Sequence, residues 1–414
     1  MLRWFIPLCL TLTVAYSGCS QTPADAAPEA SVTASAAPDP CASTPSAGQH
    51  KDGISLADAN SQRAGSVAAR LAPAKGAYFG VNLDWTNDTP AGYSRRLGHS
   101  PAVYVQFLHF PLKPDGRQIL MESARLVAGQ RALLLITLEP WEGLDSVDSR
   151  SIEALAQDVC TVNQLGVGVM VRFAHEMNGS WYPWSQQPEA YIRVFRALAN
   201  ALHQGAPKAA MLWAPNHGSG YPFNGGAFMA LPGSPDFQLL DSNRDGRLDM
   251  HDDPYAPYYP GDDAVDWAGM SLYHWGASHP WGENTPPDKG KFIGQLTGAY
   301  RGPNNEPALP DFYRQYAVVR GKPIAIAETA ALYNTERPGP DELRIKQDWW
   351  EQVFAADLLA AYPELRMINW FEWSKREPEI QNAVIDWGVT RNPELRAKFT
   401  AHLTRLPLQF APAP

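Results

Sequence analysis

The run VGVMVRFAHE (residues 167–176) is an apolar segment that ends on a histidine and a glutamate. Its residues do not alternate between apolar and polar, as they would in an antiparallel strand with one solvent-exposed face. Near-continuous apolarity is typical of parallel strands that are buried on both faces. The run therefore predicts a buried parallel strand with polar side chains at its carboxyl end.

Seven other runs have the same character, and they span residues 77–84, 102–110, 132–140, 209–216, 267–275, 323–330 and 365–373. Helix-like stretches separate them, including 151–166, 188–205 and 343–363. Alternating strands and helices of this number predict an α/β fold, a (β/α)8 TIM barrel in one domain over residues 71–410, rather than a doubly wound sheet. The connection 217–266, between the fifth and sixth strands, is a long insertion.

The first 18 residues have the layout of an export signal, with Arg3, an apolar run and then small residues. The stretch Tyr16-Ser17-Gly18-Cys19 resembles a bacterial lipobox, in which the cysteine is acylated. Residues 19–70 are rich in Ala, Pro, Ser and Thr, a composition typical of a linker. We expect an exported protein that is held on a bacterial membrane, the outer membrane or the cell surface, only by a lipid on Cys19. Plain secretion or periplasmic release is the alternative.

The composition narrows the class of partner. A formal charge of −9, from 43 acidic and 34 basic residues, disfavours nucleic acid, because phosphate binding needs clustered Lys and Arg. The 14 Trp, 16 Tyr and 15 Phe suit the apolar faces of neutral sugars as well as they suit a core. We expect a monomer that binds a polysaccharide or an oligosaccharide.

Two cysteines, Cys41 and Cys160, remain outside the signal and the lipobox. Export permits a disulfide between them. The sequence leaves open whether they meet.

A barrel of this class places its functional residues at the carboxyl ends of the strands. Glu176 ends the fourth predicted strand and Glu328 ends the seventh. Hydrolysis of a glycosidic bond needs one carboxylic acid to protonate the leaving oxygen and a second carboxylate to attack or to activate water. We assign Glu176 and Glu328 as that catalytic pair. Two identical side chains need different environments for these roles, and Arg172, His175 and Tyr273 are the candidates for setting them.

Polar and aromatic side chains at the same strand ends are candidates for substrate contact. They are Glu139, Trp141, Arg172, His175, Trp181, Trp184, Asn216, Tyr273, Trp370 and Trp373. Trp85, Trp213 and Trp275 are further candidates for an aromatic rim. Glu372, near the end of the eighth strand, is the main rival for the nucleophile. Zinc chemistry at His175-Glu176 is disfavoured, because the metalloprotease pattern needs a second His at position 179, which is Gly.

The motif His175-Glu176-Met177-Asn178-Gly179, followed by Trp181 and Trp184, resembles the signature of glycoside hydrolase family 26, a retaining family best known for β-mannanases. The resemblance implies that Glu176 is the general acid/base and that Glu328 is the nucleophile, with Tyr273 steadying the nucleophile and His175 lining the sugar site. It also implies that Glu139, in a Glu-Pro-Trp stretch, is a sugar-binding or structural acid.

The resemblance implies a (β/α)8-barrel hydrolase that cleaves β-1,4-mannan by double displacement without a catalytic cofactor. β-Glucan and β-xylan are the alternative substrates within the family. A non-catalytic carbohydrate-binding barrel is the alternative from another class, and the presence of both expected acids counts against it. The sequence leaves open whether cleavage is endo or exo.

The insertion contains a second motif, DSNRDGRLDMHD (residues 241–252). It fits an EF-hand-type calcium loop with Gly246 at position six. The expected ligands are Asp241, Asn243, Asp245, the backbone carbonyl of Arg247, Asp249 and Asp252. Asp252 replaces the usual Glu at position twelve and resembles dockerin loops. We expect a structural Ca²⁺ that orders the insertion, and a solvated acidic turn is the alternative.

Overall fold

The computed structural model describes residue 41 and residues 70–413, except for 280, 303–305, 338 and 340. The expected signal peptide, the lipidation site Cys19 and the linker, apart from Cys41 and Arg70, lie outside the described residues. The chain from Cys41 onward forms one compact unit. None of the helices in the described part of the chain is both long and apolar enough to cross a membrane.

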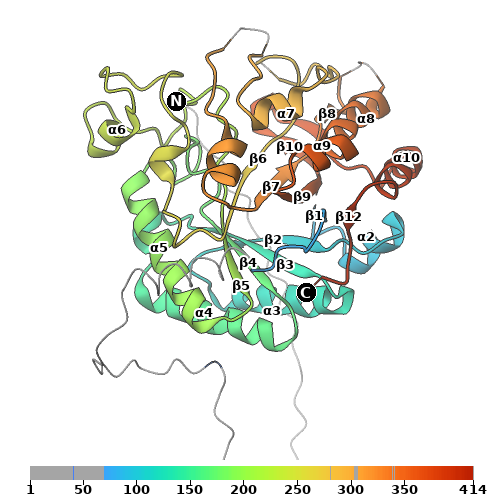
Figure 1. Cartoon of the computed structure of the whole chain (residues 1–414), viewed down its shortest axis with the longest axis horizontal. Coiled ribbons are helices and arrows are strands. Elements are labelled where there is room, and N and C mark those ends of the chain that lie inside the picture. The colour runs from blue at the N-terminus through green and yellow to red at the C-terminus, as the bar shows by residue number, and fades with distance from the viewer. Residues whose placement is uncertain are drawn as a thin grey trace, which may run out of the picture. The chain divides into compact units, whose positions relative to one another are not determined.

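Eight parallel strands form a closed barrel around which helices are arranged (Figure 1). They are β1 (Ala77–Leu83), β2 (Val103–His109), β3 (Leu133–Glu139), β4 (Val169–Phe173), β5 (Ala209–Trp213), β6 (Trp267–Ser271), β7 (Ile324–Thr329) and β9 (Leu365–Glu372). Each strand pairs in parallel with the next, and β1 also pairs with β9, which closes the ring. The predicted (β/α)8 barrel is confirmed, and all eight strands lie within the predicted runs.

The strands have two buried faces, as their apolar runs predict. One cluster takes alternate residues from all eight strands, from Tyr78 in β1 to Met367 in β9, and forms the inside of the barrel. The other residues, such as Phe79, join the side chains of the helices in a larger outer core. The register therefore decides which side chains face the barrel axis.

Nine α-helices occur in the described residues, and several have clear local signals. They are α2 (Pro90–Leu97), α3 (Pro114–Gln130), α4 (Ser149–Gln164), α5 (Pro188–Gly205), α6 (Pro235–Leu240), α7 (Lys291–Leu296), α8 (Glu342–Val353), α9 (Ala356–Ala361) and α10 (Pro393–Leu403). Asp148 and Ser151 form a capping box at the start of α4, and Pro188 occupies the first turn of α5. The predicted helix 343–363 is two helices, because the backbone at Ala355 is extended.

Shorter helical turns complete the connections. Three are 3₁₀ helices, at Leu144–Ser146, Ala256–Tyr258 and Pro378–Ile380, and one is a π-helix at Tyr313–Val318. The insertion 217–266 contains only α6 and the second of these 3₁₀ turns, and Figure 1 shows α6 standing away from the ring of strands.

The amino ends of the strands are covered by both ends of the described chain. Leu71 packs against the inner core, and the Arg70 guanidinium donates to the carbonyl of Ala209, the first residue of β5. Near the carboxyl terminus, β12 (Leu408–Gln409) pairs with the start of β1. Packed chain segments thus cover the amino ends of the strands, so we expect the functional residues at the carboxyl ends.

A small antiparallel sheet follows the carboxyl ends of β7 and β9. It consists of β8 (Tyr333–Asn334), β10 (Ser374–Glu377) and β11 (Ala383–Asp386). The strand runs predicted from the sequence do not include it.

Cys41 and Cys160 form a disulfide, with an S–S distance of 2.16 Å. Cys160 lies in α4, and the Gln164 side-chain amide of the same helix donates to Cys41 Sγ at 2.7 Å. The pairing that the sequence leaves open is therefore present.

Candidate active site

The predicted acids lie at the carboxyl ends of three barrel strands, β3, β4 and β7. Glu139 is the last residue of β3, Glu176 follows β4 by three residues, and Glu328 is near the end of β7. Arg172 in β4 reaches across the barrel interior to Glu328, and the side chain of Arg172 is fully buried. The structure thus brings the two proposed catalytic acids to one end of the barrel.

Glu328 is buried among donors. Its Oε1 accepts a hydrogen bond from Arg172 Nη1, and its Oε2 accepts one from the Tyr273 hydroxyl at 2.6 Å. Burial alone would raise the pKa of this carboxyl, but the Arg172 charge and the two hydrogen bonds outweigh burial and hold the pKa below its ordinary value. Glu328 is therefore ionised at neutral pH, as a nucleophile must be.

Glu176 is in the opposite environment. Burial, followed by the negative charge of Glu328, raises the pKa of Glu176 to about 7. The charge of Arg172 and side-chain hydrogen bonds with Ser271 and with Trp181, whose Nε1 donates to Glu176 Oε2 at 3.2 Å, favour the ionised form but do not outweigh burial. Near neutral pH Glu176 can therefore hold a proton and give it up, as a general acid/base must.

The backbone that carries Glu176 has an unusual conformation. Ala174 and Glu176 have φ angles of 45° and 54°, in the left-handed region that non-glycine residues seldom adopt. The Glu176 amide donates to the carbonyl of Ala214 after β5, at 3.1 Å, and this bond holds the turn in place. Strained residues of this kind persist where the surrounding structure fixes them, and they are common at functional sites.

Glu139 is a third acid at the same end of the barrel. Burial raises its pKa to about 7, with a smaller contribution from the charge of Glu328. Its Oε2 accepts a hydrogen bond from Trp141 Nε1 at 3.3 Å, and Trp141 is 41% exposed. This pair combines a polar group with an open aromatic face, which suits a sugar ring.

His175 is a buried, neutral side chain at this end of the barrel. Burial and then the charge of Arg172 lower the pKa of His175 to about 3. Its ring lies 4.9 Å from Tyr182 and 5.7 Å from Trp184, measured between ring centroids. It can therefore act as a hydrogen-bonding group but not as a cation.

The prediction that Trp184 contacts the substrate is wrong. Trp184 is fully buried, its Nε1 donates to the carbonyl of His175 at 2.7 Å, and it stacks on Tyr182 with centroids 4.4 Å apart. It supports His175 from behind, whereas Trp181 remains partly exposed beside Glu176. Tyr182, between the two tryptophans, is a site residue that the sequence reasoning missed.

Trp370, also a candidate for substrate contact, instead packs into the outer core. Alternation along β9 turns Trp370 outward, where it packs against Phe399 of α10 at 5.3 Å and is fully buried. Trp213 is likewise buried in the outer core, against Phe312 and Tyr316. Trp373, the residue directly after β9, is only partly buried and stacks on Phe371 with centroids 5.7 Å apart.

The remaining candidates lie around the rim. Asn216 keeps a partly exposed side chain, while its backbone amide and carbonyl bond to the side chain of Asn178 at 2.8 Å each. Trp85 and Trp275 are partly buried. Ser271 was not predicted, but its Oγ accepts from Arg172 Nη2 at 2.7 Å and so helps to orient the guanidinium.

The family model of Glycosyl hydrolase family 26 matches residues 140–226, the segment that carries Glu176 and its neighbours. Over this segment the chain thus resembles glycoside hydrolase family 26. Endoglucanase H of Acetivibrio thermocellus is 24% identical to this chain over 290 residues, which are 67% of this chain and 25% of that protein. The chain thus spans about a quarter of the length of this curated relative.

Solved structures agree with the barrel. A double mutant of a Cellulomonas fimi endo-β-1,4-mannanase has a TM-score of 0.52 and 15% identity, covering 84% of this chain and 76% of that one. A modular endo-β-1,4-mannanase from Cellulomonas fimi has a TM-score of 0.51 and 15% identity, covering 84% and 75%. At such identities the likeness establishes the fold of this chain and nothing more.

Glu372, the other acid considered as a nucleophile, has its carboxylate oxygens bound by neighbouring donors. Its carboxylate accepts from the amides of Val389 and Thr390, at 3.0 and 2.7 Å, and from the Thr390 hydroxyl at 2.5 Å. It is 3% exposed, and these donors use its oxygens. The structure therefore favours Glu328 over Glu372 for chemistry.

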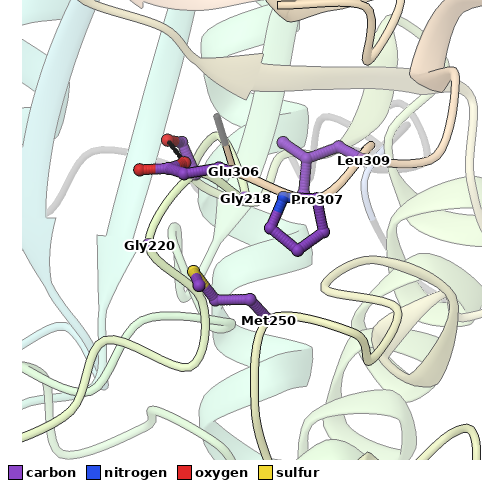
Figure 2. A pocket seen from close by; sticks show the side chains of 7 residues that line it. Gly218, Gly220, Met250, Glu306, Pro307 and Leu309 are labelled. Atoms are coloured by element: carbon purple, nitrogen blue, oxygen red, sulfur yellow. Dashed lines mark hydrogen bonds between the residues drawn. The ribbon is translucent and has the colours of Figure 1, made fainter. Parts of the chain in front are cut away.

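A small hollow lies at the insertion (Figure 2). Gly218, Gly220 and Met250 line it together with Glu306, Pro307 and Leu309, and the Ser219 hydroxyl donates to Glu306 at 2.6 Å. None of the proposed catalytic residues lines this hollow. It is separate from the site at the strand ends.

Proposed function

We propose that the chain hydrolyses β-linked polysaccharide with retention of configuration, with Glu176 as the general acid/base and Glu328 as the nucleophile. The observation that carries this proposal is the contrast between the two carboxyl groups. Arg172 and Tyr273 stabilise the ionised form of Glu328, whereas burial and the charge of Glu328 favour the protonated form of Glu176. Two acids whose environments separate their pKa values are suited to the two roles of a glycosidase.

The proposed reaction proceeds in two displacements. Glu328 attacks the anomeric carbon and forms a glycosyl ester, while Glu176 transfers its proton to the leaving glycosidic oxygen. Glu176, now ionised, then takes a proton from water as that water attacks the anomeric carbon, which releases Glu328 as a carboxylate. Retaining enzymes of this kind keep their two carboxyl groups about 5–5.5 Å apart.

We propose β-1,4-mannan as the first substrate to test. The Cellulomonas fimi structures that share the fold are endo-β-1,4-mannanases. The curated relative is an endoglucanase, which supports β-glucan as the second candidate. Comparing mannan, mixed-linkage β-glucan and β-xylan as substrates, and identifying the products, would decide between them and show whether cleavage is endo or exo.

Glu176→Ala and Glu328→Ala test the proposal directly. Loss of either group removes a catalytic function, and we expect kcat/KM to fall by about 10²–10⁴-fold or more. Reducing-sugar release from the active glycan measures this change, with circular dichroism to check the fold. Glu153→Ala, on the exposed side of α4, is the matched control and should keep wild-type activity. Equal, absent product from wild type and both variants would instead support the carbohydrate-binding alternative.

We also propose that the loop 241–252 binds a structural Ca²⁺. Its oxygen donors suit this ion, and Gly246 has the positive φ, 84°, of the sharp turn in such loops. The amides of Asp245 and Gly246 donate to Asp241 at 3.1 and 2.8 Å, which curls the chain around this side chain.

The acidic side chains of the loop 241–252 do not converge on a single position where a metal ion could bind. No cluster of three or more His, Cys, Asp or Glu side chains suited to a metal occurs in the part of the chain that the structure describes. Asp252 is buried and accepts from the amides of Ser242, at 2.7 Å, and Asp249, at 2.9 Å. Asp241, Asn243, Asp245, Asp249 and the Arg247 carbonyl are thus the groups that would hold the ion, with Asp252 bracing the loop.

We propose further that the protein is exported, acts as a monomer and is held on the membrane by a lipid on Cys19. The motif at Cys19 is the basis for this proposal, and the disulfide between Cys41 and Cys160 fits an oxidising compartment.

A further inference from the structure

An aromatic cluster surrounds the tyrosine that contacts the nucleophile. The Tyr273 ring lies 5.1 Å from Trp387 and 5.7 Å from Phe371, between centroids. Trp387 also lies 5.0 Å from Trp275. Trp387 is 1% exposed and follows β11 of the small antiparallel sheet. A side chain buried this deeply does not bind substrate, but it decides where the Tyr273 ring can lie.

Trp387 is held at both its side chain and its backbone. Its Nε1 donates to Glu377 Oε1 at 2.9 Å, and its amide donates to the carbonyl of Trp373, also at 2.9 Å. Glu377 belongs to β10 and Trp373 follows β9. The small sheet thus connects Trp387 rigidly to the end of a barrel strand.

Two buried charges hold the residues that follow Trp387. Lys346 Nζ, in α8, donates to the carbonyl of Gly388 at 2.5 Å, and Glu372 accepts from the amides of Val389 and Thr390. Lys346 and Glu372 are 0% and 3% exposed. Burying a charge is costly unless hydrogen bonds compensate it, and here both charges bind one short backbone segment. That segment, 387–390, is therefore fixed in position.

We propose that Trp387 is a positioning residue, which fixes the Tyr273 ring so that the Tyr273 hydroxyl donates to Glu328, and that Lys346 and Glu372 hold Trp387 in place. The inference rests on the proposed role of Glu328 as nucleophile. A hydrogen bond weakens steeply when its geometry is lost, and a cavity beside the ring would allow Tyr273 to move. The small sheet then acts on the chemistry without touching the substrate.

A double-mutant cycle on the full chain tests the proposal, using Trp387→Phe, Tyr273→Phe and both together. Loss of a hydrogen bond to a charged group predicts a fall in kcat of about tenfold to a hundredfold for Tyr273→Phe. Trp387→Phe should lower kcat by a smaller factor with little change in KM. The double variant should be no slower than Tyr273→Phe alone, because Trp387 acts through the tyrosine. Losses that multiply, or a Trp387→Phe variant with wild-type kcat, would overturn the proposal.

Titration of Glu328 gives a readout that does not require activity. Nuclear magnetic resonance of the protein carrying ¹³C-labelled glutamate, with Glu328→Gln for assignment, follows this carboxyl directly. The titratable and charged groups that face it are Glu139 from β3, Arg172, His175 and Glu176 from β4 and the turn after it, and Tyr273 from the end of β6. Both Trp387→Phe and Tyr273→Phe should raise the pKa of Glu328, and an unchanged pKa in Trp387→Phe would contradict the proposal.

Matched variants separate positioning from general destabilisation. Trp350→Phe makes the same truncation at a tryptophan of α8 that is 1% exposed and packs against Phe399, so it should leave kcat and the Glu328 titration unchanged. Glu377→Ala removes the acceptor for Trp387 Nε1 and should shift the titration as Trp387→Phe does, while Glu377→Gln keeps an acceptor oxygen and should not. An inactive wild type would reject the proposed function, but the titration would still decide this inference.

Discussion

Arg172 is the residue that makes two glutamates chemically different. One guanidinium nitrogen binds Glu328 and another binds Ser271, on β7 and β6, from a side chain that is fully buried in β4. A planar guanidinium with several fixed donors can do this, whereas an ammonium is a point charge. The lowered pKa of Glu328 thus depends strongly on one side chain that touches no solvent.

Arg172→Met should raise the pKa of Glu328, because the nearby positive charge is lost. In the wild type, kcat/KM should be lost at low pH as Glu328 becomes protonated, with a midpoint below the ordinary pKa of glutamate. It should be lost at high pH as Glu176 loses its proton, with a midpoint near pH 7. The variant should move the acidic limb to higher pH and narrow the active range. Profiles from pH 3 to 9 measure this, and Arg172→Lys should show a smaller shift. An acidic limb that stays in place in both variants would contradict the role assigned to Arg172.

At the scale of elements, the barrel strands were predictable and the small sheet was not. A strand buried on both faces needs an unbroken apolar run, so its sequence is distinctive. β10 reads Ser-Lys-Arg-Glu, three of its residues are exposed, and β8 has only two residues. Such strands depend on their partners rather than on their own pattern. They nevertheless place Trp387, which is why no sequence pattern pointed to that residue.

The candidate site also has features that the sequence could predict and features that it could not. Glu176 and Glu328 were predictable because strand ends determine their place in a barrel. The burial of Trp184 and Trp370 was not predictable from the sequence. Trp184 is buried because Tyr182 stacks on it, and Trp370 is buried because α10 covers it. The sequence identifies an aromatic side chain, but tertiary packing decides whether it contacts a sugar or packs against a neighbouring helix.

The calcium proposal concerns one element, the insertion that carries α6. Chelation of bound Ca²⁺ should lower the melting temperature of the wild type, because an ion that binds only the folded state stabilises it. Asp245→Ala should remove that effect, and Asp262→Ala, an exposed acid of the same insertion outside the loop, should retain it. Differential scanning calorimetry with and without chelator makes the comparison. If the wild type melts at the same temperature in both conditions, the loop is an acidic turn.

At the scale of the whole molecule, attachment by Cys19 is the proposal with the clearest test. Cys19→Ser should move the protein from the membrane fraction to the soluble fraction, because acyl chains bind bilayers through their buried methylenes. Cys160→Ser removes a different cysteine and should leave the protein with the membranes. Fractionation, with mass spectrometry of the amino-terminal peptide, checks both variants. Wild-type protein without lipid in the soluble fraction would support plain secretion.

The cross-link between Cys41 and Cys160 also has a mechanical consequence. Tension that enters the chain before residue 41 passes through the sulfur atoms directly into α4. The bridged segment contains β1, β2 and β3, so these strands carry none of that load. The seam between β1 and β9, where the ring closes, is therefore shielded from a pull on the tether. If flow or an insoluble polymer pulled on a tethered protein, the force would act on the outer helix α4 before it separated the barrel strands.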